Sequence, residues 1–192
     1  MRRAAGLGKH RGMTDAPHLL IAWHSRTGGS EALARAAADG AGSASLIAAN
    51  RVVPDDLLAA GGYLFVGPEN LAALSGAMKE MFDRCYYPCL GRLEGRPYAT
   101  IICAGSDGEG AQRQLDRIAT GWRLRRVADP MIVNTDAQTS EAILAPKTIP
   151  ANRLAEARVV RAVHRELLLP RPYAGGATTE DLHGAAVDRK SV

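Results

Sequence analysis

The sequence predicts an α/β fold in which a five-stranded parallel sheet carries helices on both faces. Short apolar runs typical of strands alternate five times with segments whose apolar residues recur at helical spacing. The composition is that of a globular domain, with 46% hydrophobic and 23% charged residues in 192. Successive strand–helix units form parallel sheets through right-handed crossovers, and five of them fit the doubly wound strand order 2-1-3-4-5.

The elements follow from apolar spacing along the chain. Strands are expected at residues 18–23, 45–48, 63–67, 98–104 and, more weakly, 126–133. Helices are expected at 31–41 and 55–60, and in three further segments with one apolar face each. Those faces consist of Ala77, Met78, Met81, Phe82 and Cys85, then Ala111, Leu115, Ile118 and Trp122, then Ala157, Val160, Val163 and Leu167. We interpret all three as core packing.

The excess positive charge lies at one end of the chain. Residues 1–12 hold four basic residues and no acidic one, so the rest of the chain has no net charge. A neutral domain does not indicate a nucleic-acid surface. We therefore expect a flexible basic arm at 1–13, one domain at 14–169 and a mobile tail at 170–192.

Membrane and metal sites are not expected. No apolar run reaches the roughly 18 residues of a membrane span, and the first residues lack the apolar stretch of a signal peptide, so we expect a cytoplasmic protein. Cys103 lies in a strand-like run and is interpreted as a core residue. Cys85 and Cys89 have no matching second pair of ligands for zinc.

The loop after the first strand is suited to bind an anion. Residues 24–31 place hydroxyls and two glycines before a helix start, where backbone N–H groups and the helix dipole favour negative charge. Ser25, Thr27 and Ser30 can add hydroxyl hydrogen bonds, and Arg26 can add a positive charge. The loop has neither the lysine of a Walker A loop nor the dinucleotide fingerprint G-x-G-x-x-G.

Two further loops fall at the same edge of the expected sheet. The loop at 67–76, after the third strand, is apolar in its middle, which suits contact with a flat ring. The loop at 104–110, after the fourth strand, has three glycines that permit close approach to a ligand. Taken alone, each of the three loops also fits an ordinary turn or a loop packed on the next helix. Together they lie where sheets of this order bind ligands.

These loops carry a family resemblance. Ser-x-Thr-Gly-x-Ser-Glu at 25–31 resembles the phosphate loop of flavodoxin-like FMN proteins. Gly-Pro-Glu-Asn at 67–70, Ser-Gly-Ala-Met-Lys at 75–79 and Phe-Asp-Arg at 82–84 resemble the flavin-ring loop and following helix of the NAD(P)H-dependent FMN and quinone reductases. The architecture is similar over roughly 18–168, whereas the motifs are confined to the three loops and that helix.

The resemblance implies a flavin site and an activity. It assigns the FMN phosphate to Ser25, Arg26, Thr27, Gly28, Gly29 and Ser30, one side of the ring to Pro68, Glu69, Asn70 and Leu71, and its other edge to Gly105, Ser106, Asp107 and Gly108. Leu71 stands where relatives often have an aromatic residue. The implied reaction transfers a hydride from NAD(P)H to FMN and then reduces a quinone-like acceptor. By location alone, Glu69 and Asp107 are the candidate acids or bases.

Single residues argue against several other protein classes. A response-regulator receiver needs acidic residues after the first strand, and a tyrosine phosphatase needs a cysteine in that loop; the sequence has neither there. A Ser-His-Asp hydrolase would need a G-x-S-x-G elbow, which is absent. A non-enzymatic electron carrier, or a member that has lost catalysis, stays open. The neutral domain favours an enzyme, because such carriers tend to be acidic. A homodimer and a homotetramer both stay open.

Overall fold

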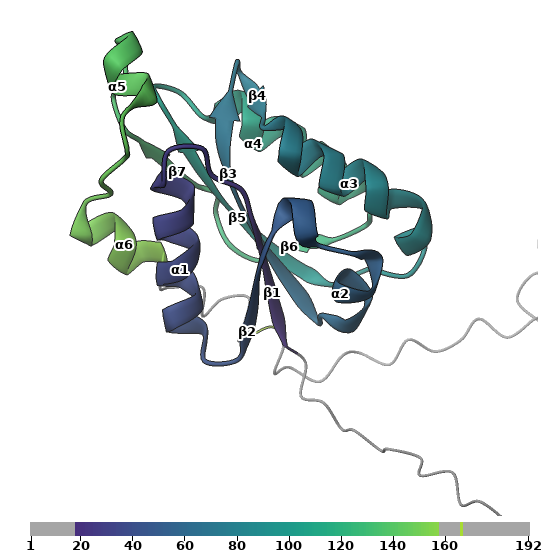
Figure 1. Ribbon diagram of the computed structural model, residues 1–192. Helices are drawn as coiled ribbons and strands as arrows, with labels where there is room; N and C mark the ends of the chain where they lie inside the picture. Colours follow the sequence, from purple (N-terminus) through teal and green to yellow (C-terminus); the bar gives the residue numbers. More distant parts are fainter. Residues whose placement is uncertain (1–17, 158–165, 167–192) are drawn as a thin grey trace, which may run out of the picture.

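The computed structural model describes residues 18–157 and Glu166, and Figure 1 shows how their elements are arranged. The strands are β1 (Leu19–Trp23), β2 (Ala44–Ala48), β3 (Gly62–Asn70), β4 (Ala73–Leu74), β5 (Pro97–Ala104), β6 (Arg125–Arg126) and β7 (Met131–Asn134). The helices are α1 (Gly29–Ala41), η1 (Ala49–Arg51), α2 (Pro54–Ala59), α3 (Gly76–Cys89), α4 (Glu109–Gly121), α5 (Ser140–Leu144) and α6 (Ala151–Ala157). The expected arm at 1–13 and tail at 170–192 lie outside the described residues.

The sheet confirms the predicted fold class. Strands β2, β1, β3 and β5 lie side by side in that order, all parallel, and β6 and β7 both pair in parallel with β5. Two details differ from the prediction. The expected fifth strand is divided into two short pieces, and Pro130 between them has no N–H to donate to a ladder. The short β4 pairs antiparallel with β3, which makes the sheet seven-stranded.

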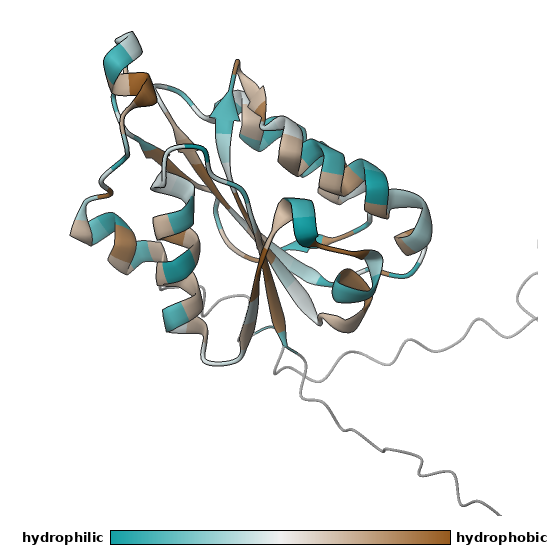
Figure 2. Ribbon diagram, viewed as in Figure 1, coloured by the Kyte–Doolittle hydropathy of each residue, from teal (hydrophilic) through white to brown (hydrophobic). Residues whose placement is uncertain are grey.

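Two cores cover the two faces of the sheet, as the alternation of side chains along β1 requires. Leu20 belongs to the cluster beneath α2, α3 and α4, together with Phe65, Met78, Phe82 and Trp122. Leu19 and Ile21 belong to the cluster beneath α1, together with Leu33, Leu64, Val66 and Ala157. Figure 2 shows the apolar strands inside and polar colour on the outer sides of the helices.

The last described helix, α6, covers the start of the final segment that the sequence predicts to be helical. It begins at Ala151, directly after Pro150, and Ala157 is buried on the α1 face. The other three positions of the predicted apolar face, Val160, Val163 and Leu167, lie outside the described residues. The short helix α5 and the segment after it, residues 145–150, were not predicted from the sequence.

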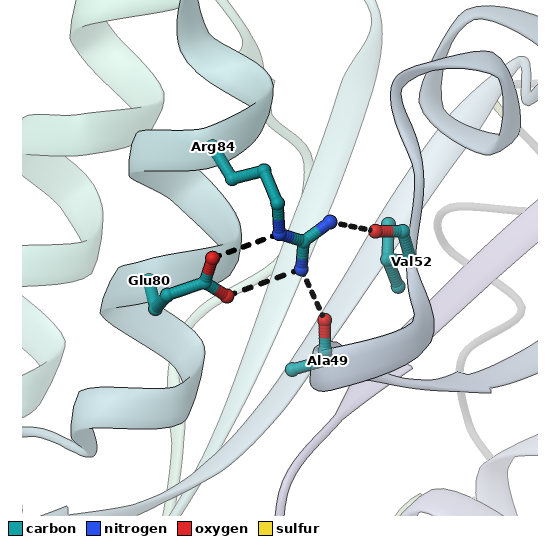
Figure 3. A network of polar contacts seen from close by, with 4 residues as sticks. All are labelled: Ala49, Val52, Glu80 and Arg84. Atoms are coloured by element: carbon teal, nitrogen blue, oxygen red, sulfur yellow. Dashed lines mark hydrogen bonds and ion pairs between the residues drawn. The ribbon is translucent and has the colours of Figure 1, made fainter.

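Arg84 of α3 binds the segment that follows β2 (Figure 3). Its guanidinium donates to the carbonyl oxygens of Val52 and Ala49 and forms an ion pair with Glu80 one helical turn earlier. The resemblance had singled out Phe-Asp-Arg, and here the arginine has a structural role in positioning η1. Within residues 18–157, no helix combines the length and apolar character that a membrane crossing requires.

Candidate functional site

The three predicted loops meet at the carboxyl edge of the parallel strands. The backbone N–H of His24 donates to the carbonyl of Val66 at 3.0 Å, which joins the end of β1 to β3. Glu69 of β3 bonds to the backbone of Gly108 in the third loop at 2.7 Å. Gly29 of the first loop packs against Cys103 at the end of β5. The structure therefore brings together the segments that the sequence singled out separately.

The first loop forms a tight turn that leaves the start of α1 without a side-chain cap. Ser25 Oγ accepts a hydrogen bond from the backbone N–H of Gly28 at 3.0 Å, so its own hydroxyl proton remains available to a ligand. Gly28 is the N-cap residue with φ 88°, a left-handed conformation that glycine adopts without strain. Thr27 is half-buried and Arg26 is exposed. The uncapped N–H groups and the helix dipole make this turn a potential anion site.

Ser30 places a buried hydroxyl inside the loop. Its side chain is 1% exposed, its hydroxyl lies beside the Cys103 thiol, and within the described residues it makes no hydrogen bond to a nitrogen or oxygen atom. The nearby Cys103 thiol has its pKa raised by burial, and the Ser30 hydroxyl and the Lys147 charge oppose that rise. A raised pKa keeps this thiol protonated and unreactive at neutral pH.

The segment after α5 holds the first loop from the side, which the sequence did not indicate. The backbone N–H of Lys147 donates to the carbonyl of Thr27 at 2.7 Å. The Lys147 ammonium donates to the carbonyl oxygens of Ala142, Ile143 and Ala145, so it terminates α5. A Cβ on Gly29 would lie 2.8 Å from Cys103 Sγ and 3.2 Å from Lys147 Cβ, so only glycine fits between them.

The second segment is a hairpin, which corrects the prediction of a loop at 67–76. Strand β3 continues through Pro68, Glu69 and Asn70, and a two-residue turn leads into β4. Both turn residues, Leu71 and Ala72, have positive φ, at 53° and 57°. A two-residue hairpin turn requires these angles, although glycine and asparagine usually supply them. The side chain of Leu71 is fully exposed at the tip.

Glu69 joins the hairpin to the amino-terminus of α4. Its two carboxylate oxygens accept from the backbone N–H groups of Gly108, at 2.7 Å, and Ala111, at 3.2 Å. The Ala72 carbonyl packs so closely on Gly110 that a Cβ there would lie 2.1 Å from the oxygen. Glu69 is thus engaged in positioning two loops, whereas Asp107, the other candidate acid or base, is exposed.

The third loop is supported from the far edge of the sheet. The carbonyl of Gly105 accepts from Ala137 N at 3.2 Å, and that of Ser106 accepts from Asn134 Nδ2 at 3.1 Å. Gly108 is buried, has φ 94° and forms the N-cap of α4. A side chain at Gly108 would collide with Ile132 of β7.

His24 lies between the first loop and the hairpin. Its Nδ1 is 2.9 Å from the hydroxyl of Ser75, which is fully buried at the start of α3. Burial and the neighbouring charge of Arg26 lower the pKa of His24, so the imidazole is neutral at pH 7. The described residues contain no group of three or more His, Cys, Asp or Glu side chains arranged to hold a metal ion.

The chain is similar to known proteins in its fold. No protein-family model and no curated protein sequence matches the chain. An archaeal flavodoxin superimposes with a TM-score of 0.63 at 13% identity, covering 78% of this chain and 98% of the flavodoxin. The flavodoxin, WrbA-like protein of Agrobacterium tumefaciens superimposes with a TM-score of 0.60 at 19% identity, covering 78% of this chain and 98% of that protein. This chain has the flavodoxin-like fold. Flavodoxin 1 of Bacillus cereus has the same fold. It superimposes with a TM-score of 0.62 at 14% identity, covering 79% of this chain and 99% of the flavodoxin.

In the flavodoxin-like chain, the strand order reverses at β1 and β3. Open sheets of this kind bind ligands at that point, outside the carboxyl ends of the strands. The first loop, the hairpin and the third loop all lie there, so the fold and the local geometry indicate the same edge of the molecule (Figure 1).

Proposed function

We propose that this flavodoxin-like chain binds FMN and acts as an NAD(P)H-dependent oxidoreductase. The single observation that carries the proposal is the helix-start loop, whose N–H groups have no side-chain cap and which holds the buried hydroxyl of Ser30. An unsatisfied buried hydroxyl costs about 1–3 kcal/mol, and a phosphate oxygen bound in this loop would satisfy it. The terminal phosphate of FMN supplies oxygens that accept from this hydroxyl and from the loop N–H groups.

The other two segments fit the flat ring of the same ligand. The hairpin and the third loop are held at a fixed separation by Glu69, whose carboxylate accepts from backbone N–H groups at the start of α4. The exposed Leu71 offers an apolar surface at the tip of the hairpin. Backbone N–H groups can stabilise negative charge on the reduced ring without reorganisation. When bound, FMN supplies the hydride chemistry, and the chain supplies position and polarity.

The residues of the chain have distinct roles in this proposal. The first loop binds the phosphate, with hydroxyls from Ser25, Thr27 and Ser30. The neutral His24, oriented by Ser75, adds an uncharged polar group between the loop and the hairpin. The reductant is NAD(P)H and the acceptor is a small quinone-like molecule, consistent with the resemblance in the loops.

The first experiment is the visible absorption spectrum of the purified protein, followed by calorimetric titration with FMN and with riboflavin. We expect flavin bands, and tighter binding of FMN, because riboflavin lacks the phosphate. Ser30→Ala should weaken FMN at least tenfold, leave riboflavin unchanged and slightly raise the melting temperature of the flavin-free protein. Ser43→Ala, an exposed serine beyond the other end of α1, is the control. Equal affinity for FMN and riboflavin in the wild type would contradict the phosphate assignment.

A second experiment separates the enzyme from the alternative electron carrier. The FMN-loaded protein is mixed anaerobically with NADPH, and bleaching of the flavin absorbance is followed. Rapid bleaching supports hydride transfer from the dinucleotide. A protein that binds FMN but is reduced only by a one-electron donor is a carrier instead.

A further inference from the structure

A groove on α4 lies beside the site described above. It has a volume of about 520 Å³, it is open to solvent, and Arg113, Gln114, Arg117 and Ile118 line it. Gln114 also supports the hairpin, because its side-chain oxygen accepts from the backbone N–H of Leu74 at 2.8 Å. The groove therefore begins at the foot of the hairpin whose tip carries Leu71.

The two arginines in the groove differ from most other arginines of the described residues, because no hydrogen bond or ion pair engages their guanidinium groups there. Elsewhere in the described part, arginine side chains bond to carboxylates or backbone carbonyls, as at positions 35, 84, 92, 96, 123, 125, 126 and 153. Within residues 18–157, no hydrogen bond or ion pair involves Arg113 or Arg117. The fold thus leaves two free cations in one concave surface.

Helix geometry places both cations on one side of the groove. Positions four apart lie on the same face of a helix, separated by about 6 Å along its axis. The guanidinium group binds phosphate through paired N–H donors and stacks on flat rings. Beside them, Ile118 supplies an apolar surface. Phosphate next to an aromatic base is the combination that such a groove suits.

We propose that this groove binds the phosphate-bearing adenosine end of the nicotinamide dinucleotide and that Arg113 and Arg117 select NADPH over NADH through its 2′-phosphate. The proposal rests on the proposed function, because it extends the flavin site along α4. A dinucleotide whose nicotinamide reaches the ring beside Leu71 would pass the hairpin and follow α4 toward the arginines. The volume lies within the range of about 300–1,000 Å³ typical of small-ligand sites, which favours a small molecule over a protein surface.

The test compares wild type with the double variant Arg113→Gln and Arg117→Gln. The control is Arg35→Gln, which also removes positive charge but lies on α1, on the opposite face of the sheet. Calorimetry measures NADP⁺ and NAD⁺ binding to the FMN-loaded proteins. We expect wild type to prefer NADP⁺ and the double variant to bind NADP⁺ at least tenfold more weakly, with NAD⁺ changed less than threefold. Unchanged NADP⁺ affinity, or an equal loss in Arg35→Gln, would overturn the proposal.

Two further measurements distinguish loss of binding in the groove from loss of flavin binding or of the fold. FMN affinity and melting temperature of the double variant should equal those of wild type, since no hydrogen bond or ion pair within the described residues joins either arginine to the three loops. Adenosine 2′,5′-bisphosphate and AMP are also titrated into flavin-free protein. Preferential binding of the bisphosphate, lost in the double variant, supports the groove even if FMN does not bind. Absence of that preference in the wild type rejects the groove whatever the flavin result.

Discussion

The carboxylate of Glu69, at the end of β3, accepts a hydrogen bond from the backbone N–H of Gly108, which begins α4, at 2.7 Å. The two residues are 39 positions apart in the chain and belong to different predicted loops. A negative group at a helix amino-terminus satisfies open N–H donors and interacts favourably with the helix dipole. This one contact fixes the separation of the two segments proposed to flank a flavin ring.

Replacing Glu69 by glutamine should destabilise the domain by about 1–2 kcal/mol, because one amide oxygen replaces two charged acceptors. Urea unfolding at neutral pH measures the loss. Glu109→Gln also removes one negative charge at the start of α4, but it breaks neither hydrogen bond of Glu69. We expect it to lower the free energy of unfolding by less than about 1 kcal/mol. If both variants lose the same free energy of unfolding, the effect of Glu69 comes from the helix dipole alone.

Gly110→Ala should destabilise by about 1–3 kcal/mol, because the new methyl group would overlap the Ala72 carbonyl and push the hairpin away from α4. Gly121→Ala in the same helix is the control, since nothing lies within 4 Å of a Cβ there. The control should be neutral or stabilising by up to about 1 kcal/mol. A stable Gly110→Ala protein would mean that the hairpin does not rest on α4.

Leu71→Trp should tighten FMN binding by about 1 kcal/mol, because a planar side chain stacks on a ring better than leucine does. Turnover with NADPH should slow, because the indole would compete for the open ring face. Flavin fluorescence quenching and steady-state kinetics measure the two effects. Leu90→Trp, at an exposed position after α3, should change neither. No change in Leu71→Trp would show that Leu71 does not face the flavin.

Lys147→Met should cost about 1–3 kcal/mol, because three carbonyl oxygens at the end of α5 lose a charged donor. The loss should appear as faster amide hydrogen exchange in the segment 142–147 and at the adjoining first loop. Lys79→Met removes an exposed pair with Asp83 and should change stability by less than about 0.5 kcal/mol. Exchange that accelerates equally in both variants would contradict a specific role for Lys147.

His24 should make the domain less stable as the pH falls. Its pKa is lowered by burial and by Arg26, so below about pH 6.5 the unfolded chain binds a proton that the folded chain resists. The stability associated with neutral His24 is thus present above that pH and is lost on acidification. Urea unfolding at pH 7.5 and pH 5.5 measures the difference, which should shrink in His24→Gln. An unchanged pH dependence in the variant would assign the effect to other groups.

Local sequence patterns are enough to predict the parallel sheet and its helical layers. Apolar runs such as 19–23 and the helical stripe of Met78, Met81 and Phe82 are set by periods of two and of 3.6 residues, and these are local properties. The glycines and hydroxyls of the first loop are also local signals, because Gly28 takes the left-handed conformation at the helix start and donates its N–H to Ser25 three residues earlier. The edge of the sheet that carries the three loops followed from strand order.

The positions of the loops depend on contacts between residues that lie far apart in the chain. Nothing near Lys147 in sequence predicts its bond to Thr27, since the two residues lie 120 positions apart. The hairpin was missed because Leu71 and Ala72 adopt left-handed angles that their own chemistry disfavours, and contact of Ala72 with Gly110 accompanies them. The free arginines of the groove are likewise a tertiary property. Whether an arginine finds a partner depends on which surfaces the fold places beside it.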